Sequence, residues 1–153
     1  MRMGLRMEVD VKSWAILAAL QANARQSLTE LAQTVGLSVP AVSERVRRLE
    51  EAGVIQGYHA QVAPLRAGYA LSALVGITVP QPDKKTLLAR LEAMPEVMEC
   101  HHVTGVDSYT FRLLARDVSH LEQLVAQLND LGETRTAIIL STPIQGRPVR
   151  PPR

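Results

Sequence analysis

The sequence has little cysteine, few aromatic residues and no long apolar run. Its one cysteine, Cys100, cannot form a disulfide within the chain, which favours a reducing compartment. Aromatic residues make up only 3% of the chain, so leucine, valine, isoleucine and alanine must build its cores. No apolar run is long enough to span a bilayer, and the first ten residues lack the apolar core of a signal peptide. We therefore expect a cytoplasmic protein with no membrane partner.

Positive charge is concentrated in two places. The net charge is only +2, but Arg45, Arg47 and Arg48 lie within four positions of one another. The segment 144–153 contains three arginines, four prolines or glycines and no acidic residue. Local basic clusters of this kind suit a polyanionic partner such as nucleic acid. We expect the tail 144–153 to be extended or disordered, although its arginines could instead follow DNA phosphates.

The region 10–53 carries the signals of consecutive short helices. Asp10 can cap a first helix, whose apolar residues recur with helical spacing. Ser27 and Glu30 form a capping box at the start of a second helix. Gly36 can end this second helix, because glycine readily adopts the left-handed conformation found at helix ends.

A third helix follows at once. Ser38 can cap it, Pro40 falls in its first turn, where a missing N–H is harmless, and Gly53 can end it. A short helix, a glycine turn and a longer helix are typical of a helix-turn-helix. Weak alternation over 54–62 predicts an exit strand. We thus expect a winged-helix-like DNA-binding domain over 1–62.

The remainder of the chain predicts a second, α+β domain. Proline and glycine mark a linker at 63–68, and the domain extends over 69–143. Apolar alternation, helical spacing and turn residues predict its elements in the order strand, helix, strand, strand, helix, strand. These elements are expected at 69–79, from Asp83, at 97–104, at 109–115, from Asp117 and at 134–142. This βαββαβ order is the ferredoxin-like arrangement.

Four stretches together resemble the Lrp/AsnC family of "feast/famine" transcription regulators. They are VDVKSWAILAAL, LTELAQTVGLSVPAVSERVRRLEEAGVIQGYHAQV, MPEVMECHHVTGVDSY and TRTAIIL, and the resemblance covers about residues 9–142. It implies a regulator that binds double-stranded DNA through its first domain. It also implies a second domain that binds a small molecule, an amino acid in many relatives, and that assembles dimers into a higher oligomer, often an octamer.

The outward positions of the third helix are the candidate DNA contacts. A major groove admits one α-helix, whose first turns meet the base edges. A serine hydroxyl can bond to several bases, a glutamate can accept from a cytosine amine, and arginines suit phosphates or guanine. The predicted contacts are Thr29, Ser38, Val39, Ala41, Ser43, Glu44, Arg45, Arg47 and Arg48. The alternative is an ordinary solvated basic face.

The resemblance places the ligand site near the turn before the third strand. Carried over to this sequence, it implies Gly105, Val106, Asp107 and Ser108, with Thr134 and Thr136 on the last strand. Backbone N–H groups of a glycine turn can hold a carboxylate, and an aspartate can hold an ammonium group. An amino acid carries both groups. The same four residues would also make an ordinary hairpin turn.

Other constellations point to no catalysis and no cofactor. Cys100 and His102 share one face of a strand, but two ligands fall short of the usual four for a metal. The favoured hypothesis is a sequence-specific, nucleoid-associated regulator whose oligomeric state or DNA affinity responds to a ligand. The alternative is a ligand-independent architectural protein that wraps or bridges DNA. An enzyme with an accessory helix-turn-helix is disfavoured, since no catalytic set of residues is evident.

Overall fold

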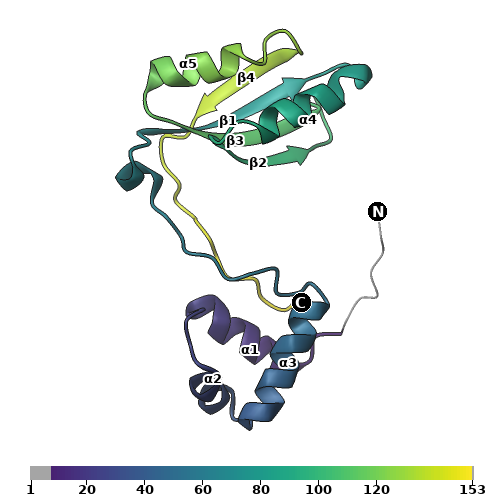
Figure 1. The fold of residues 1–153 in the computed structure, drawn as a ribbon, viewed down its shortest axis with the longest axis vertical. Coiled ribbons are helices and arrows are strands. Elements are labelled where there is room, and N and C mark those ends of the chain that lie inside the picture. The colour runs from purple at the N-terminus through teal and green to yellow at the C-terminus, as the bar shows by residue number, and fades with distance from the viewer. Residues whose placement is uncertain (1–7, 153) are drawn as a thin grey trace. The chain divides into compact units, whose positions relative to one another are not determined.

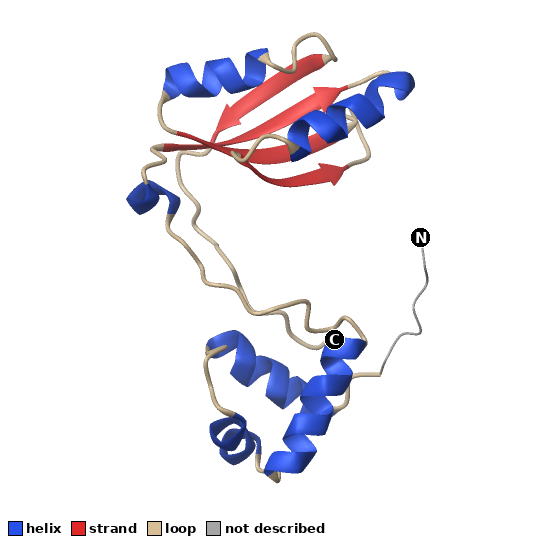
Figure 2. Cartoon of the chain, in the orientation of Figure 1, coloured by secondary structure: helices blue, strands red, loops and turns tan. Residues whose placement is uncertain are grey.

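The computed structural model describes residues 8–152, which form two compact units (Figures 1 and 2). The first unit contains the described residues up to Ala60 together with the tail that begins at Ile144. The second unit comprises Gln61–Pro143. None of the helices in the described part of the chain is long and apolar enough to cross a membrane.

Three helices make up the first unit: α1 (Val11–Ala22), α2 (Leu28–Val35) and α3 (Val39–Glu51). They enclose a small apolar core, in which each helix contributes buried side chains. The fully or nearly fully buried members are Ile16, Leu17, Leu31, Ala32, Val35, Val42 and Leu49. The helix-turn-helix predicted from the sequence is therefore confirmed as a folded unit.

The predicted caps account for where these helices begin and end. The N–H of Ser13 donates to the Asp10 carboxylate at 2.7 Å, at the start of α1. Both halves of the capping box between Ser27 and Glu30 are present at the start of α2. Gly36 ends α2 with a φ of 65°, in the left-handed region that glycine adopts without a steric penalty.

The exit strand expected over 54–62 does not form. Residues 56–63 have no helix or strand, and no other segment of the described chain lies in register with them to complete a ladder. A strand needs a partner for its backbone N–H and C=O groups, and apolar alternation alone supplies none. A short 3₁₀ turn, Pro64–Ala67, follows within the segment 63–68 that we expected to be a linker.

The second unit is a four-stranded antiparallel sheet with the strand order β2-β3-β1-β4. Its elements follow the predicted βαββαβ order, and the fold class is α+β as expected. They are β1 (Leu71–Thr78), α4 (Lys84–Glu92), β2 (Val97–His102), β3 (Tyr109–Ala115), α5 (Val118–Ala126) and β4 (Glu133–Ile138).

Both helices of this unit cover the same face of the sheet (Figure 1). Val75, Phe111 and Leu87 are completely buried between the sheet and the helices. On the opposite face, Leu74 of β1 remains 44% exposed and lies in register with Arg112 of β3. One face of the sheet is thus an apolar core, and the other is open.

Candidate DNA-binding surface and effector turn

The outer face of α3 presents the predicted contact residues. Ser43 is exposed in the middle of the helix, and Val39 is 38% exposed in its first turn. Ser38 caps the helix by accepting the N–H of Ala41 at 3.4 Å, so part of its hydrogen-bonding capacity serves the fold. Thr29 is exposed in the first turn of α2, where N–H groups lack partners within the helix and suit a phosphate.

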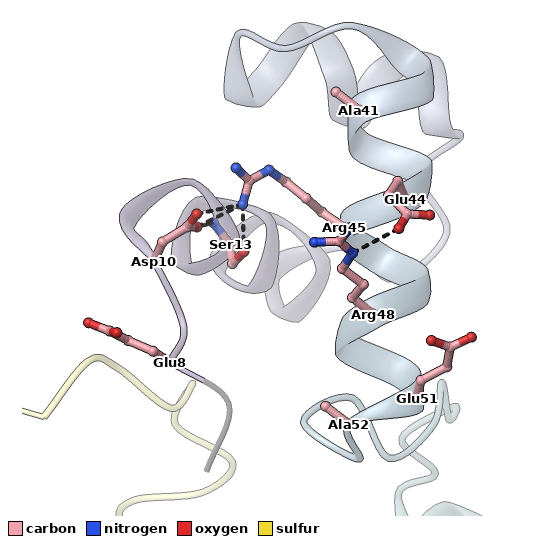
Figure 3. Close-up of a pocket in the computed structure, with 9 residues that line it drawn as sticks. All are labelled: Glu8, Asp10, Ser13, Ala41, Glu44, Arg45, Arg48, Glu51 and Ala52. Atoms are coloured by element: carbon pink, nitrogen blue, oxygen red, sulfur yellow. Dashed lines mark hydrogen bonds and ion pairs between the residues drawn. The ribbon is translucent and has the colours of Figure 1, made fainter. Parts of the chain in front are cut away.

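Arg45 differs from the other two arginines because it is engaged with α1 (Figure 3). Its guanidinium donates to the Asp10 carboxylate at 2.7 Å and to the Ser13 hydroxyl at 3.0 Å. The Ser13 N–H, and then the Arg45 guanidinium, lower the pKa of Asp10 to about 2. In the free protein, Arg45 therefore clamps the start of α1 to α3.

Arg47 and Arg48 are exposed and share one acid, Glu44. The Glu44 carboxylate accepts from Arg47 Nη2 and from Arg48 Nε, each at 2.8 Å. These bonds, led by the one from Arg47, lower the pKa of Glu44 to about 2, so it stays ionised. Arg47 also pairs with Glu51 one turn later. The exposed cations of this helix are thus partly neutralised by acids of the same helix.

A groove of about 720 Å³ runs between the start of α1 and α3 (Figure 3). Charged side chains of both signs line it, including Glu8, Glu44, Arg45 and Arg48. The dashed contacts in Figure 3 show that Arg45 is paired with Asp10 across the groove and Arg48 with Glu44 along it. Its charge pattern suits exchange with a polyanion on the outer surface of α3 better than capture of an apolar small molecule.

The turn between β2 and β3 is anchored to the end of β1. Gly105 has a φ of 118°, a conformation that favours glycine. The Thr78 hydroxyl donates to the Val106 carbonyl at 3.0 Å, and the Ser108 N–H donates to the Ile77 carbonyl at 2.8 Å. The Ser108 hydroxyl is also committed, since it accepts the N–H of Val79 at 3.2 Å. The turn is therefore held in place by backbone and hydroxyl contacts.

Asp107 is the charged centre of this turn. Its carboxylate pairs with Arg135 of β4 at 2.5 Å and lies directly over Gly76 of β1. A Cβ added at Gly76 would lie only 2.4 Å from Asp107 Oδ2, so the missing side chain provides the space for the carboxylate. Sequence reasoning missed both Gly76 and Arg135. A glycine inside an otherwise apolar strand was the available signal.

Thr134 and Thr136 are not brought together with Asp107. They lie in register with Ile77 and Val75, which face the helices, whereas Arg135 lies in register with Gly76 on the open face. Cross-strand partners share a face of a sheet, so the two threonines point away from the Asp107–Arg135 pair. The predicted last strand forms but ends at Ile138 and not at residue 142, and its side chain on the side of the turn is Arg135.

Cys100 and His102 lie in register with Phe111 and Tyr109 on the helix-covered face. Burial raises the pKa of the Cys100 thiol, which disfavours the reactive thiolate. The His102 and Tyr109 rings pack with their centroids 4.9 Å apart. Among residues 8–152, no group of three or more potential ligands converges on a metal site. These side chains take part in the packing of the sheet.

Two family models match the chain, one on the helices of the first unit and one on the second unit and part of the tail. Residues 10–56 match a winged helix-turn-helix DNA-binding family, and residues 72–149 match the Lrp/AsnC ligand binding domain. The second match alone spans half of the chain. The first match contains α3, and the second contains the turn between β2 and β3.

Individual proteins agree with these matches. The HTH-type transcriptional regulator LrpA of Mycobacterium tuberculosis is 42% identical over 83% of this chain and 87% of its own. The regulatory protein AsnC of Escherichia coli is 31% identical over 94% of this chain and 97% of its own.

A solved structure also resembles the chain over nearly its whole length. It is a feast or famine regulatory protein from M. tuberculosis complexed with L-methionine, with a TM-score of 0.87 and 39% identity, and it covers 94% of this chain and 100% of that one. The proteins matched are transcriptional regulators, which form a non-enzymatic family. The chain belongs to the Lrp/AsnC family of transcriptional regulators, with a DNA-binding helix-turn-helix domain and a ligand-binding domain.

Proposed function

We propose that this regulator binds specific duplex DNA through α3 and changes its DNA affinity or oligomeric state when an amino acid binds near Asp107. The observation that carries the proposal is the pairing of Asp107 with Arg135 above Gly76. An anionic and a cationic side chain side by side match the ammonium and carboxylate groups of a free amino acid. Its site of action is then the nucleoid, in the cytoplasm.

The residues that we propose for the effector site differ from those that the sequence resemblance implied. Asp107 and Arg135 supply the two charges, while Gly105 and Val106 supply exposed backbone at the turn. Ser108 serves to fix the turn, because its hydroxyl is bonded to Val79. The methionine complex of the M. tuberculosis relative supports an amino acid as the class of effector.

On the DNA side, Ser43 and Val39 of α3 are the residues that we propose meet base edges. Arg47 and Arg48 exchange their acid partners for phosphates on binding. Since one helix-turn-helix binds weakly, specific recognition needs two copies across a pseudo-palindrome. The open sheet face is the surface that we propose pairs two chains, and such dimers then associate further.

The decisive experiment measures thermal unfolding of the purified protein against each of the twenty amino acids, with mass by light scattering on the same samples. A ligand at about 100 times its dissociation constant stabilises the folded protein by roughly 2.7 kcal/mol, which is visible as a melting shift. We expect a shift with one or a few amino acids. Asp107→Ala and Gly76→Ala should both abolish it, the first by removing the charge and the second by displacing it.

Ser43→Ala combined with Arg47→Ala separates the two functions. This double variant should lose specific DNA binding, while its melting shift and its mass stay those of the wild type. A protein that binds DNA as a stable oligomer and shows no shift with any amino acid would favour the architectural alternative. A double variant with a smaller mass would contradict the division of labour between the units.

A further inference from the structure

The tail makes one specific contact with the DNA-binding unit. The N–H of Val149 donates to Gln21 Oε1 at 2.7 Å, and the Val149 carbonyl accepts from Gln21 Nε2 at 3.0 Å. The two residues are 128 positions apart in the sequence. One side-chain amide thus pairs with both backbone groups of one residue, as a neighbouring strand would.

Gln21 and Val149 lie at the edge of a hollow of about 580 Å³ on the first unit. Trp14, Leu17 and Leu20 of α1 line it, together with the segment Val54–His59. That segment is itself fixed to α3, because the Tyr58 hydroxyl donates to Glu50 at 2.9 Å. Burial and the Glu50 carboxylate raise the pKa of Tyr58 to about 12, so the phenol remains a donor. Both walls of the hollow are therefore held by the three-helix core.

The sequence around Val149 suits an extended chain in this position. Pro148 precedes it, and Pro151 and Pro152 follow shortly after. Proline fixes φ and disfavours helical backbone in the residue before it, so the free tail already resembles its docked form. Less conformational entropy is lost when such a segment docks than when a flexible one does. Gln21 forms its hydrogen bonds with backbone atoms of Val149 alone, so this recognition does not depend on the valine side chain, and the residue stays largely exposed.

We propose that the tail is a strap, which docks on α1 of its own chain and gives the DNA-binding unit a second tether. The chain leaves the first unit after Ala60 and returns to it at Ile144. A unit on one flexible connection can sample many positions, whereas two connections restrict that sampling. The strap begins at Ile144, six positions after the end of β4, the strand that carries Arg135. When the strap is docked, it therefore restricts the distances at which the DNA-binding units of two paired chains can contact DNA.

Crosslinking tests the docking itself, independently of DNA binding. Cys100 is the only cysteine, so Cys100→Ser provides a clean background for Gln21→Cys with Val149→Cys. A short bismaleimide crosslinker should join this pair within one chain at least severalfold faster than the control pair, Gln33→Cys with Val149→Cys. Gln33 is an exposed glutamine of α2. A product between two chains, or a rate no higher than the control, would overturn the proposal.

The consequence for DNA binding rests on the proposed function and is measured separately. Duplexes enriched from random DNA by the wild-type protein supply one half-site and a series of paired half-sites with different spacings. The Gln21→Leu variant and a chain truncated after Pro143 should bind the single half-site with the affinity of the wild type. The wild type should prefer one spacing of paired half-sites several-fold, and both variants should lose that preference. An unchanged spacing preference, or weaker binding to the half-site alone, would reject the strap. Failure of the wild type to bind any duplex would instead reject the DNA-binding proposal and leave the crosslinking result standing.

Discussion

At the scale of single residues, Glu44 shows how one acid can control a basic helix face. Its carboxylate accepts hydrogen bonds from both Arg47 and Arg48. Any phosphate that these arginines bind must compete with it. A phosphate backbone carries dense negative charge, so an ionised Glu44 also repels DNA. This repulsion is offset only where Glu44 accepts a hydrogen bond from a base.

We therefore predict that Glu44→Gln increases affinity for DNA of random sequence several-fold. The arginines are then free to take phosphates, and the dependence of log affinity on log salt should steepen by about 0.9 for each phosphate gained. Fluorescence anisotropy of a labelled random duplex over a salt series measures both quantities.

Glu51→Gln is the matched control, because Glu51 contacts Arg47 but not Arg48. Glu51→Gln should also increase affinity for random DNA, but by less than Glu44→Gln does. If Glu44→Gln instead weakened binding to the selected site and left random DNA unchanged, Glu44 would be a base-reading residue, as the sequence first indicated.

At the scale of elements, α1 and α3 are joined by the ion pair between Asp10 and Arg45. The pKa of Asp10 is about 2 in the folded chain, against an ordinary value of 3.8. The unfolded chain therefore binds more protons in this range, and the contribution of Asp10 to stability is present above about pH 4 and lost as the pH falls to about 2.

Asp10→Asn keeps a side-chain cap for α1 but removes the charge. We predict that it lowers the free energy of unfolding at pH 7 by up to about 1 kcal/mol, the range of exposed ion pairs. The difference from the wild type should disappear near pH 2. Urea unfolding followed by the fluorescence of Trp14, the only tryptophan, reports this unit directly.

Asp83→Asn is the comparison variant, since Asp83 precedes α4 without a side-chain cap bond. It should leave the Trp14 transition where it is. A difference between Asp10→Asn and the wild type that is as large at pH 2 as at pH 7 would show that the ion pair with Arg45 is not its source.

The elements were predictable because their signals are local. Asp10, the Ser27–Glu30 box and Gly36 act within one turn of their own helix, and the structure confirms each. The partners of charged residues far apart in the sequence were not predictable. Arg45 finds Asp10 at a separation of 35 residues, and Arg135 finds Asp107 at 28, and only the packed fold brings them together. The exit strand failed for the same reason, because a strand depends on a partner.

At the scale of the whole molecule, the open face of the sheet leaves Leu74 exposed. If this face pairs two chains, Leu74→Asp buries a carboxylate whose cross-strand neighbour, Arg112, already pairs with Glu99. The added charge is then left unbalanced in the interface, which costs far more than the dimer contact gains. We predict that Leu74→Asp lowers the mass measured by light scattering to that of a smaller species, and that binding to paired half-sites weakens with it.

Leu88 offers a matched control on the other side of the sheet. It lies on α4 and is 42% exposed, close to the 44% of Leu74. Leu88→Asp should leave the mass unchanged. Equal loss of mass in both variants would indicate general destabilisation, and an unchanged mass in Leu74→Asp would place the assembly surface elsewhere.

The first unit is discontinuous in sequence, because the tail from Ile144 belongs with the helices before Ala60. The second unit thus lies, as an insertion, between two segments of the first, and the tail that follows it is shared with the ligand-binding family match, which extends to residue 149. Exchange of effector domains between related genes then needs two recombination points, one on each side of the insertion, to keep a matched α1 and tail. A single crossover in the linker would join the helices of one parent to the tail of the other, which was selected to dock on a different α1.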